Sequence, residues 1–290
     1  MDSAEASGGL GPVVVGTDGS APAGVAVLWA AEEAARRGRP LTVVSALGSD
    51  ETRYVGPEGL QELLQDADRC LRHTVDLVTA RYPDLAVDTV LSRGDPADSV
   101  LEAAGATGTA VVGSRGLGGF SGLLLGSVGL RAAARARGPL VVVHRVPEPE
   151  RGVVVAAARD DGDRDALRFA ARSALARGAA LRVVSAWMFL EGVGSMVPMV
   201  DDVAAVAADE AGATRRTVRP LREEFPHLEI TEQTVRTRST GGALVTASED
   251  ADLLVLGARR PTHRFRAPFG GVTHAVLHHA QCPVAVIHGG

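Results

Sequence analysis

The stretch VVVGTDGS, at residues 13–20, gives the first indication of the fold. Three consecutive valines are typical of a buried β-strand, and the two glycines that follow indicate a tight turn at its end. Residues 22–37 then carry apolar side chains at helical spacing, with Val25, Leu28 and Trp29 among them. A strand, a tight turn and a helix in direct succession predict the first part of a βαβ unit.

The alternation of strand and helix patterns continues along the first half of the chain. Short Val-rich runs predict strands at residues 12–17, 40–47, 85–91, 109–113 and 140–145. Helical periodicity predicts helices at residues 22–37, 60–82, 96–106 and 127–137. Because the strand segments are apolar on both faces, we expect a five-stranded, mostly parallel sheet with helices on both faces. The predicted fold class is therefore α/β, of the doubly wound type.

The second half of the chain repeats the first. VVV at residues 13–15 returns at residues 153–155, and PLVVVH at residues 139–144 is matched by PVAVIH at residues 283–288. Between the copies stands PEPER, at residues 147–151, which is polar and contains two prolines, as is typical of a linker. Two copies of one module are the simplest explanation. The predicted domains are residues 1–147 and residues 151–290.

Composition excludes several classes of protein. All 30 basic residues are arginine, and the absence of lysine rules out both a Walker-A phosphate loop and Schiff-base catalysis. Cys70 and Cys282 are too few for a disulfide framework or a four-thiolate zinc site, so we expect free thiols. A net charge of −5 with 3% aromatic residues argues against nucleic-acid binding. The chain shows neither a long uncharged apolar run nor a signal-peptide pattern, so we expect a cytoplasmic protein without membrane contact.

In a doubly wound sheet, ligands bind beyond the carboxyl ends of the strands. The segments of the first copy expected there are GTDGS at residues 16–20, Ala46, and the glycine-rich loop GSRGLGGFSG at residues 113–122, which leads to a helix start at residues 126–127. Such a loop lets backbone N–H groups approach phosphate oxygens, unless it is a flexible surface linker. Asp18 would accept hydrogen bonds from a ribose, or it would serve the turn or cap the helix. The small Ala46 leaves room for a flat base.

These motifs resemble a known family. GxxG at residues 113–116, followed after nine residues by GS at residues 126–127, is similar to the nucleotide-binding signature of the universal stress protein family. VGTDGS at residues 15–20 and RGDP at residues 93–96 resemble further motifs of that family. The resemblance covers nearly the whole chain, as a tandem of two domains. It implies two flavodoxin-like domains and a protein that binds ATP, often with Mg²⁺, during stress responses.

The resemblance also implies residue roles and a mode of pairing. The residue matching Asp18 contacts the nucleoside, the position matching Ala46 lines the adenine, and the glycine motif surrounds the phosphates. The implied cofactor-binding residues are Gly16, Thr17, Asp18, Ala46, Val112, Gly113, Arg115, Gly116, Gly126, Ser127 and Val128. Family members pair through their final strands. By analogy, residues 140–144 would pair antiparallel with residues 283–288, as an internal pseudo-dimer or between two chains as a homodimer.

The second copy departs from this pattern. Ala158 stands where the first copy has Asp18, and Arg260 stands where it has Gly116. We therefore predict that this copy has lost ordinary ATP binding and serves structure, pairing or another ligand. A basic segment there would bind a different anion or form a solvated loop; it contains Arg259, Arg260, His263, Arg264 and Arg266. The acidic run at residues 160–165 is interpreted as a charged helix entry. Helix histidines, rather than metal ligands, are predicted at His274, His278 and His279.

The first copy lacks the parts that phosphoryl transfer requires. No general base is visible near the expected γ-phosphate, and no Gly-x-Ser-x-Gly elbow occurs. We therefore predict an ATP-binding regulatory protein without a catalytic residue or a metal site of its own, acting on an unidentified protein partner. A slow ATP-hydrolysing enzyme and a nucleotide-independent interaction scaffold are the alternatives.

Overall fold

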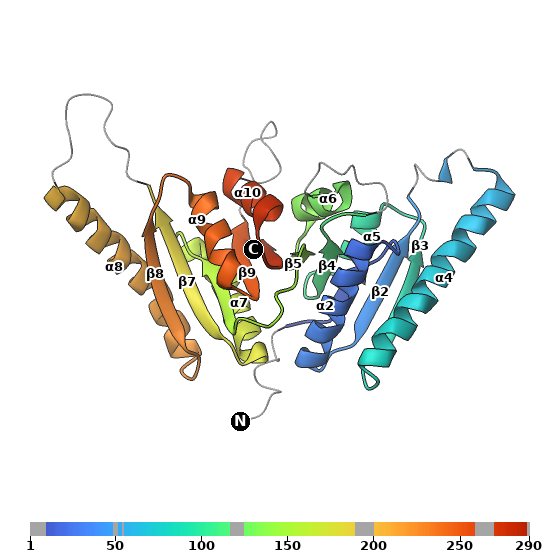
Figure 1. Cartoon of the computed structure of the whole chain (residues 1–290), viewed down its shortest axis with the longest axis horizontal. Coiled ribbons are helices and arrows are strands. Elements are labelled where there is room, and N and C mark those ends of the chain that lie inside the picture. Colours follow the sequence, from blue (N-terminus) through green and yellow to red (C-terminus); the bar gives the residue numbers. More distant parts are fainter. Residues whose placement is uncertain are drawn as a thin grey trace. The chain divides into compact units, whose positions relative to one another are not determined.

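The structure, a computed structural model, describes residues 10–48, 52–53, 55–116, 125–188, 200–258 and 270–288, apart from the side chains of residues 200–202. The chain divides into two compact units, each with a sheet flanked by helices (Figure 1). Unit 1 comprises Met1–Val146 with Pro283–His288, and unit 2 comprises Pro147–Cys282 with Gly289–Gly290. Among the described helices, none is both long enough and apolar enough to span a membrane.

The first five strands of unit 1 follow the order β3-β2-β1-β4-β5, and every neighbouring pair is parallel. They are β1 (Val13–Gly16), β2 (Leu41–Ala46), β3 (Val87–Ser92), β4 (Thr109–Gly113) and β5 (Leu140–Val143). The strand order reverses between β1 and β4, where Val13 pairs with Thr109 and Val15 with Val111. This is the predicted doubly wound arrangement, and a ligand crevice is expected at the reversal.

The last strand of the chain completes this sheet. β10 (Val284–His288) pairs antiparallel with β5 inside unit 1, with Val284 opposite Val142 and Val286 opposite Leu140. The antiparallel pairing expected for the two final strands is therefore confirmed within one chain. It occupies an edge of β5 that would otherwise present unpaired backbone groups.

Helices cover both faces of this sheet. They are α2 (Ala21–Arg37), α4 (Pro57–Arg81), α5 (Pro96–Ala104) and α6 (Ser127–Arg135). α2 packs beside α4, and α5 packs beside α6. Val13, Val14 and Val15 are at most 1% exposed although successive strand residues point to opposite faces, so neither face of β1 is open. Trp29 of α2 is buried in this core, as predicted.

Local interactions fix the ends and the orientation of α2. Ser20 caps its first turn by accepting a hydrogen bond from the Ala23 N–H at 3.3 Å, and Gly38 ends it in the left-handed conformation, at φ 59°. Near its end, the buried Arg37 donates to Glu33 at 2.8 Å and to Thr109 of β4 at 2.8 Å. The ion pair with Glu33 lies within α2, and the hydrogen bond to Thr109 ties the helix to β4.

The edge strand β3 differs from the prediction. Its sequence suggested a strand buried on both faces, but Val90 and Leu91 are each 38% exposed. β3 ends the strand order and packs against α4. A strand at this place has one sheet neighbour and less helix cover than the central strands, so its apolar residues stay accessible.

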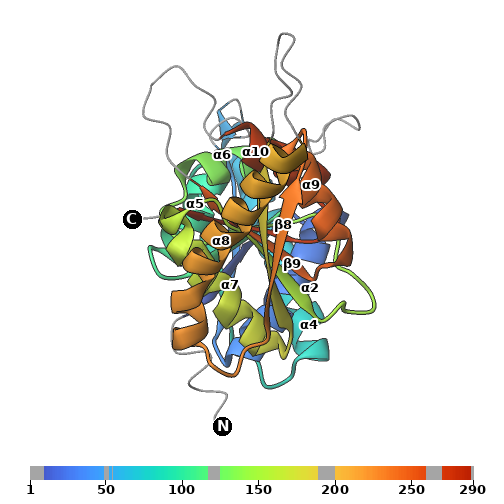
Figure 2. The same cartoon turned by 90° about the vertical axis from the view of Figure 1, so that its left-hand side faces the viewer.

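Unit 2 repeats this topology. Its parallel strands, in the order β8-β7-β6-β9, are β6 (Val153–Ala157), β7 (Ala180–Trp187), β8 (Ile230–Arg236) and β9 (Leu253–Ala258). The helices are α7 (Arg164–Arg177), α8 (Val200–Glu224), α9 (Thr240–Ala247) and α10 (Gly271–His279), with short 3-10 turns η1 (Asp161–Asp163) and η2 (Ser248–Asp250). Figure 2 shows α7 and α8 on one side of β8 and α9 on the other.

Candidate functional site

The tip of β1 is a turn built by its own polar groups. The Thr17 N–H donates to the Val44 carbonyl at 2.8 Å and so continues the β1–β2 ladder. The Gly19 N–H then donates to Thr17 Oγ1 at 3.2 Å, and the Ser20 N–H donates to Asp18 Oδ1 at 3.0 Å. Gly19 has φ +78°, which a side chain would disfavour. The turn leaves Asp18 exposed at the carboxyl end of the sheet.

The glycine motif converges on this turn. A Cβ built on Gly116 would overlap Asp18 Oδ2, so the loop after β4 touches the tip of β1. The Gly126 N–H donates to the Ser114 carbonyl at 2.7 Å, which returns the chain to β4 at the start of α6. The glycine-rich segment therefore begins against Asp18 and ends against the backbone of Arg115 and Gly116. The rest of that segment, residues 117–124, lies outside the described residues.

The start of α6 offers hydrogen-bond donors to this crevice. Gly126 is its N-cap, in extended conformation, and supplies no side-chain hydrogen bond to the first turn. Uncapped N–H groups at a helix start, together with the positive end of the helix dipole, favour an anion. Ser127, in the first turn, and Arg115, directly after β4, are both exposed. The arrangement is suited to bind an oxyanion next to a carboxylate.

Several of the predicted site residues have a packing role in the structure. A Cβ on Gly113 would lie 2.9 Å from the Pro22 carbonyl oxygen, so this glycine lets β4 approach the start of α2. A Cβ on Gly16 would lie 2.8 Å from a methyl group of Val100 in α5. The side chain of Val112 is only 3% exposed. These residues shape the crevice through the backbone rather than line it with side chains.

The two remaining predicted residues lie at its sides. Ala46 ends β2, opposite Ser92, and is half-buried. Its small side chain is compatible with a flat group against the strand end. Val128, in the first turn of α6, is also half-buried.

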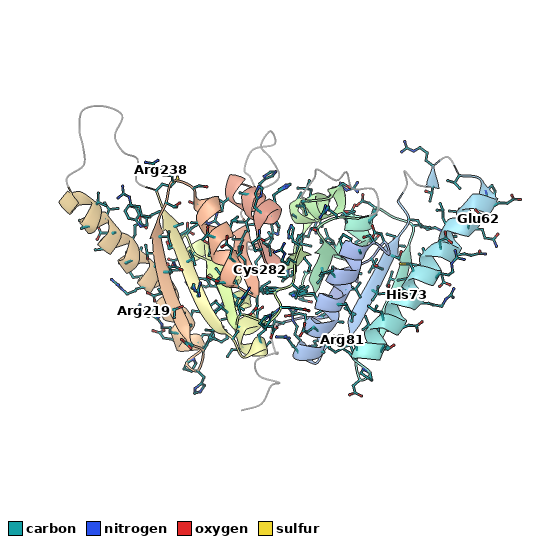
Figure 3. The ribbon with its side chains drawn as sticks, in the orientation of Figure 1. Glu62, His73, Arg81, Arg219, Arg238 and Cys282 are labelled. Carbon is teal, nitrogen blue, oxygen red and sulfur yellow. The ribbon has the colours of Figure 1, made fainter. Side chains whose placement is uncertain are left out.

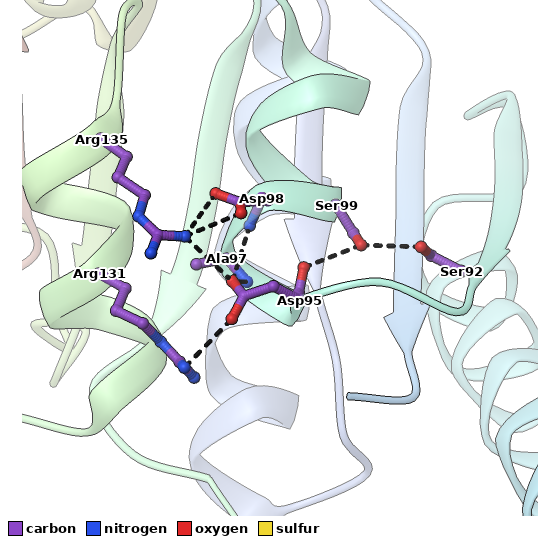
Figure 4. A network of polar contacts seen from close by, with 7 residues as sticks. All are labelled: Ser92, Asp95, Ala97, Asp98, Ser99, Arg131 and Arg135. Carbon is purple, nitrogen blue, oxygen red and sulfur yellow. Dashed lines mark hydrogen bonds and ion pairs between the residues drawn. The ribbon is translucent and has the colours of Figure 1, made fainter. Parts of the chain in front are cut away.

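A polar network joins α6 to α5, and sequence reasoning missed it (Figure 4). Asp95 caps α5 by accepting hydrogen bonds from the N–H groups of Ala97, at 3.0 Å, and Asp98, at 3.2 Å. Its other carboxylate oxygen pairs with Arg131 of α6 at 3.1 Å. One turn further along α6, Arg135 donates to both carboxylate oxygens of Asp98, at 2.9 and 2.8 Å. These pairs hold the helix whose first turn faces the crevice, and the four-residue spacing of the two arginines was the available signal.

Unit 2 fills the corresponding crevice with its own side chains. Ala158 follows β6, and the guanidinium of the next residue, Arg159, donates to the Gly257 carbonyl at 2.9 Å and to Asp163 Oδ1 at 2.7 Å. Asp163 is 2% exposed and also accepts from the Arg159 N–H at 2.8 Å. The hydrogen bond to Asp163 raises the pKa of Arg159. A cavity of only about 40 Å³ remains beside these groups.

The acidic run does enter a helix, as predicted. Asp160 caps η1 by accepting from the Gly162 N–H at 2.9 Å, and η1 leads directly into α7. The pairing of the buried Asp163 with Arg159 was not foreseen, although the i,i+4 spacing of the two residues was a signal for it. The basic segment, with Arg259, Arg260, His263, Arg264 and Arg266, lies outside the described residues.

The histidines and cysteines of the described ranges form no further candidate site. The rings of His274 and His278 stack at 4.3 Å on α10. No group of three or more potential metal-ligating side chains occurs among the described residues. Both cysteines are free thiols, as predicted, and burial, assisted by the charge of Asp252, raises the pKa of Cys282 to about 12.

The doubly wound sheet and the glycine-framed crevice beyond its strand ends define a flavodoxin-like α/β protein, built twice along one chain. The family model for the "Universal stress protein family" matches residues 10–144 and again residues 151–288. Universal stress protein Rv2005c of Mycobacterium tuberculosis is 30% identical over 286 residues, covering 94% of this chain and 96% of that protein. Universal stress protein Rv2624c of the same organism is 28% identical over 279 residues, covering 95% of each. A crystal structure of a universal stress protein from Archaeoglobus fulgidus has the same fold, with a TM-score of 0.71 at 16% identity over 96% of both chains. The chain therefore belongs to the universal stress protein family, as a tandem of two domains.

Proposed function

We propose that this protein is a stress-response regulator that binds one ATP, at the first copy of its domain, residues 1–147. The observation that carries the proposal is the contact of Asp18 with Gly116 beside the uncapped start of α6. A carboxylate next to a glycine-framed helix start suits a ribose joined to a phosphate chain.

Each predicted residue then has a task. Asp18 Oδ2 accepts a hydrogen bond from a ribose hydroxyl, while Oδ1 stays engaged with the Ser20 N–H. Ala46 contacts the adenine. The phosphates lie against the backbone of Gly116 and Gly126, with Ser127 and Arg115 donating from the rim. Thr17 and the buried Val112 hold the strand ends in place, as do Gly16 and Gly113, and Val128 borders the site.

Mg²⁺ would enter with the nucleotide. Mg²⁺ keeps several water ligands and is commonly bound through substrate phosphates rather than by a dedicated cage of side chains. The exposed Ser127 hydroxyl, in the first turn of α6, would contact the ion or one of its water ligands.

We further propose that the second copy, residues 151–290, does not bind ATP in the ordinary way. Ala158 has no acceptor for a ribose, and the Arg159 guanidinium is already bound to Asp163 and to the Gly257 carbonyl. A nucleotide would have to break the ion pair between Arg159 and the buried Asp163 to enter a space of about 40 Å³. This copy therefore serves structure, strand pairing or another ligand.

The site assignment is tested by calorimetric titration of the full chain with ATP and Mg²⁺. Asp18→Ala should weaken binding by roughly tenfold or more, because a charge-assisted hydrogen bond is lost. Asp84→Ala removes the same charge from an exposed turn of the same unit and should leave binding unchanged. Equal affinity of Asp18→Ala and the unmodified protein would refute the assignment. ADP release measured on the same samples distinguishes binding from slow hydrolysis.

A further inference from the structure

Unit 2 contains a second, larger hollow that is separate from the crevice beyond its strand ends. A groove of about 500 Å³ lies between α9 and the face of β7 and β8. Arg182 and Val184 of β7 line it, and so do Gln233 and Val235 of β8. Val184 is in register with Gln233, so these alternate strand residues share one face. The groove volume is within the range of small-molecule sites.

The opposite wall is a helix with small side chains. Gly242, Ala243 and Ala247 of α9 line the groove, with Thr246 between them. In unit 1, the residue at the repeat position of Ala243 is Ser99, whose hydroxyl hydrogen-bonds to Ser92 Oγ at 2.8 Å and so bridges helix and strand. Alanine has no hydroxyl to make that bridge, and α9 leaves the space open.

Arg182 brings a positive charge and hydrogen-bond donors to the groove. It is a half-buried arginine within a β-strand, where the first copy has Thr42. Its guanidinium makes no hydrogen bond or ion pair with any residue of the described ranges. A guanidinium has five donors and a permanent positive charge, and its planar fork fits carboxylates and phosphates. A group of this kind, facing a hollow of this size, is suited to bind an oxyanion.

Other polar groups line the same groove. Arg238 and Ser239 line the groove at the end where β8 leads into α9, and Figure 3 shows Arg238 there. The connecting loop is fixed by Thr237, whose Oγ1 accepts from the Ser239 N–H at 3.0 Å. Asp250 lines the groove as well and would accept a hydrogen bond from a hydroxyl or an amine. Val184 and Val235 provide an apolar wall.

We propose that this groove binds a small organic anion, with a carboxylate or phosphate group paired to Arg182 and an apolar body along Val184 and Val235. The site would give the second copy a ligand of its own. It involves no residue of the ATP site in unit 1, so the two proposals stand or fall separately.

The test uses benzoate and phenyl phosphate, which share an aromatic ring and differ in the acid group. Calorimetric titration of the full chain should show saturable binding of at least one of them, and the stronger binder identifies the acid. Arg182→Gln should weaken that binding roughly tenfold or more. Arg219→Gln is the matched control, since Arg219 is 79% exposed on α8, away from the groove (Figure 3). The affinity of Arg219→Gln for the probe should equal that of the unmodified protein.

A second variant fills the groove without removing charge. Ala243→Leu should abolish binding of the probe, and Arg182→Lys should retain part of it because the charge is kept. Thermal melting of each variant checks that unit 2 is folded. Absence of saturable binding by both probes overturns the proposal. Binding that persists in folded Arg182→Gln or Ala243→Leu also overturns it.

Discussion

Asp18 Oδ2 occupies the space that a side chain on Gly116 would need, so the tip of β1 and the loop after β4 are in direct contact. Gly126 is drawn to the same place by its hydrogen bond to the Ser114 carbonyl. The tip of β1, the loop after β4 and the start of α6 thus form one crevice at the reversal of the strand order. The proposed ATP site depends on this convergence.

Gly116→Ala should weaken ATP binding by roughly tenfold, because its methyl group displaces the Asp18 carboxylate. Gly116 has no left-handed φ, so the backbone itself accepts alanine. The double variant with Asp18→Ala should bind no more weakly than either single variant, since both remove the same interaction. Calorimetry measures the ATP affinity of all three variants. Gly24→Ala is the control, because a side chain at this position of α2 would meet open space. If the losses of binding free energy in the two single variants add fully in the double variant, Gly116 and Asp18 do not act through the same interaction.

Asp95→Ala should lower the free energy of unfolding by about 1–2 kcal/mol, because α5 loses its N-cap. It should also weaken ATP binding a few-fold, since the pair between Asp95 and Arg131 holds α6. Asp95→Asn keeps a capping oxygen and should restore most of the stability. Urea denaturation and ATP titration measure the two effects separately. An unchanged ATP affinity in Asp95→Ala would show that the network does not position α6.

Glu33→Ala should destabilise the protein by about 3–5 kcal/mol, because it leaves the buried guanidinium of Arg37 without its carboxylate. Glu32→Ala is the matched control one residue earlier: Glu32 pairs with Arg36 at 2.7 Å but is partly exposed. This substitution should cost about 1 kcal/mol or less. Urea denaturation followed by tryptophan fluorescence measures both. Equal losses in the two variants would show that burial of the Glu33 pair is energetically unimportant.

Acidification should destabilise unit 2 through His278. Burial lowers the pKa of this histidine, and the neighbouring His274 and His279 lower it further. As the pH falls through the ordinary histidine pKa, the unfolded chain takes up a proton that folded His278 does not, so the free energy of unfolding decreases. Once the pH is below the pKa of His278 in the folded protein, this group causes no further decrease in the free energy of unfolding. Urea midpoints at about pH 7.5 and about pH 5.5 measure the effect.

Two variants check the origin of that pH dependence. His278→Leu should reduce the difference between the two midpoints, because the titrating group is gone. His227→Gln removes an exposed histidine of the same unit and should leave the difference as it is. A pH dependence that survives His278→Leu unchanged would assign it to other groups.

The fold was predictable because local and long-range signals agree. Runs such as Val13–Gly16 and Leu140–Val143 are buried on both faces, so their composition alone identifies them as central strands. The predicted end of the first helix at residue 37 is correct, and Gly38 stops the helix there in the left-handed conformation. The exposed β3 was misjudged because its place at the edge depends on strand order, which no local pattern encodes.

The candidate site was predictable in part. Its glycines and Asp18 stand out by spacing, but the sequence does not reveal that Gly113 is also required where β4 approaches Pro22. The closure of the second crevice was missed because Arg159 binds the Gly257 carbonyl, a backbone group far along the chain. A side-chain contact with a distant backbone carbonyl cannot be recognised from the composition or periodicity of the sequence.

The proposal of a single ATP site is tested most directly by the number of ATP molecules bound per chain, measured by equilibrium dialysis of the full protein with Mg²⁺ present. We expect one, with lower occupancy at the same ATP concentration in Asp18→Ala and unchanged occupancy in Arg159→Ala. Two molecules per chain would show that the second crevice opens despite the pairing of Arg159 with Asp163. No bound ATP would contradict the proposed site in unit 1.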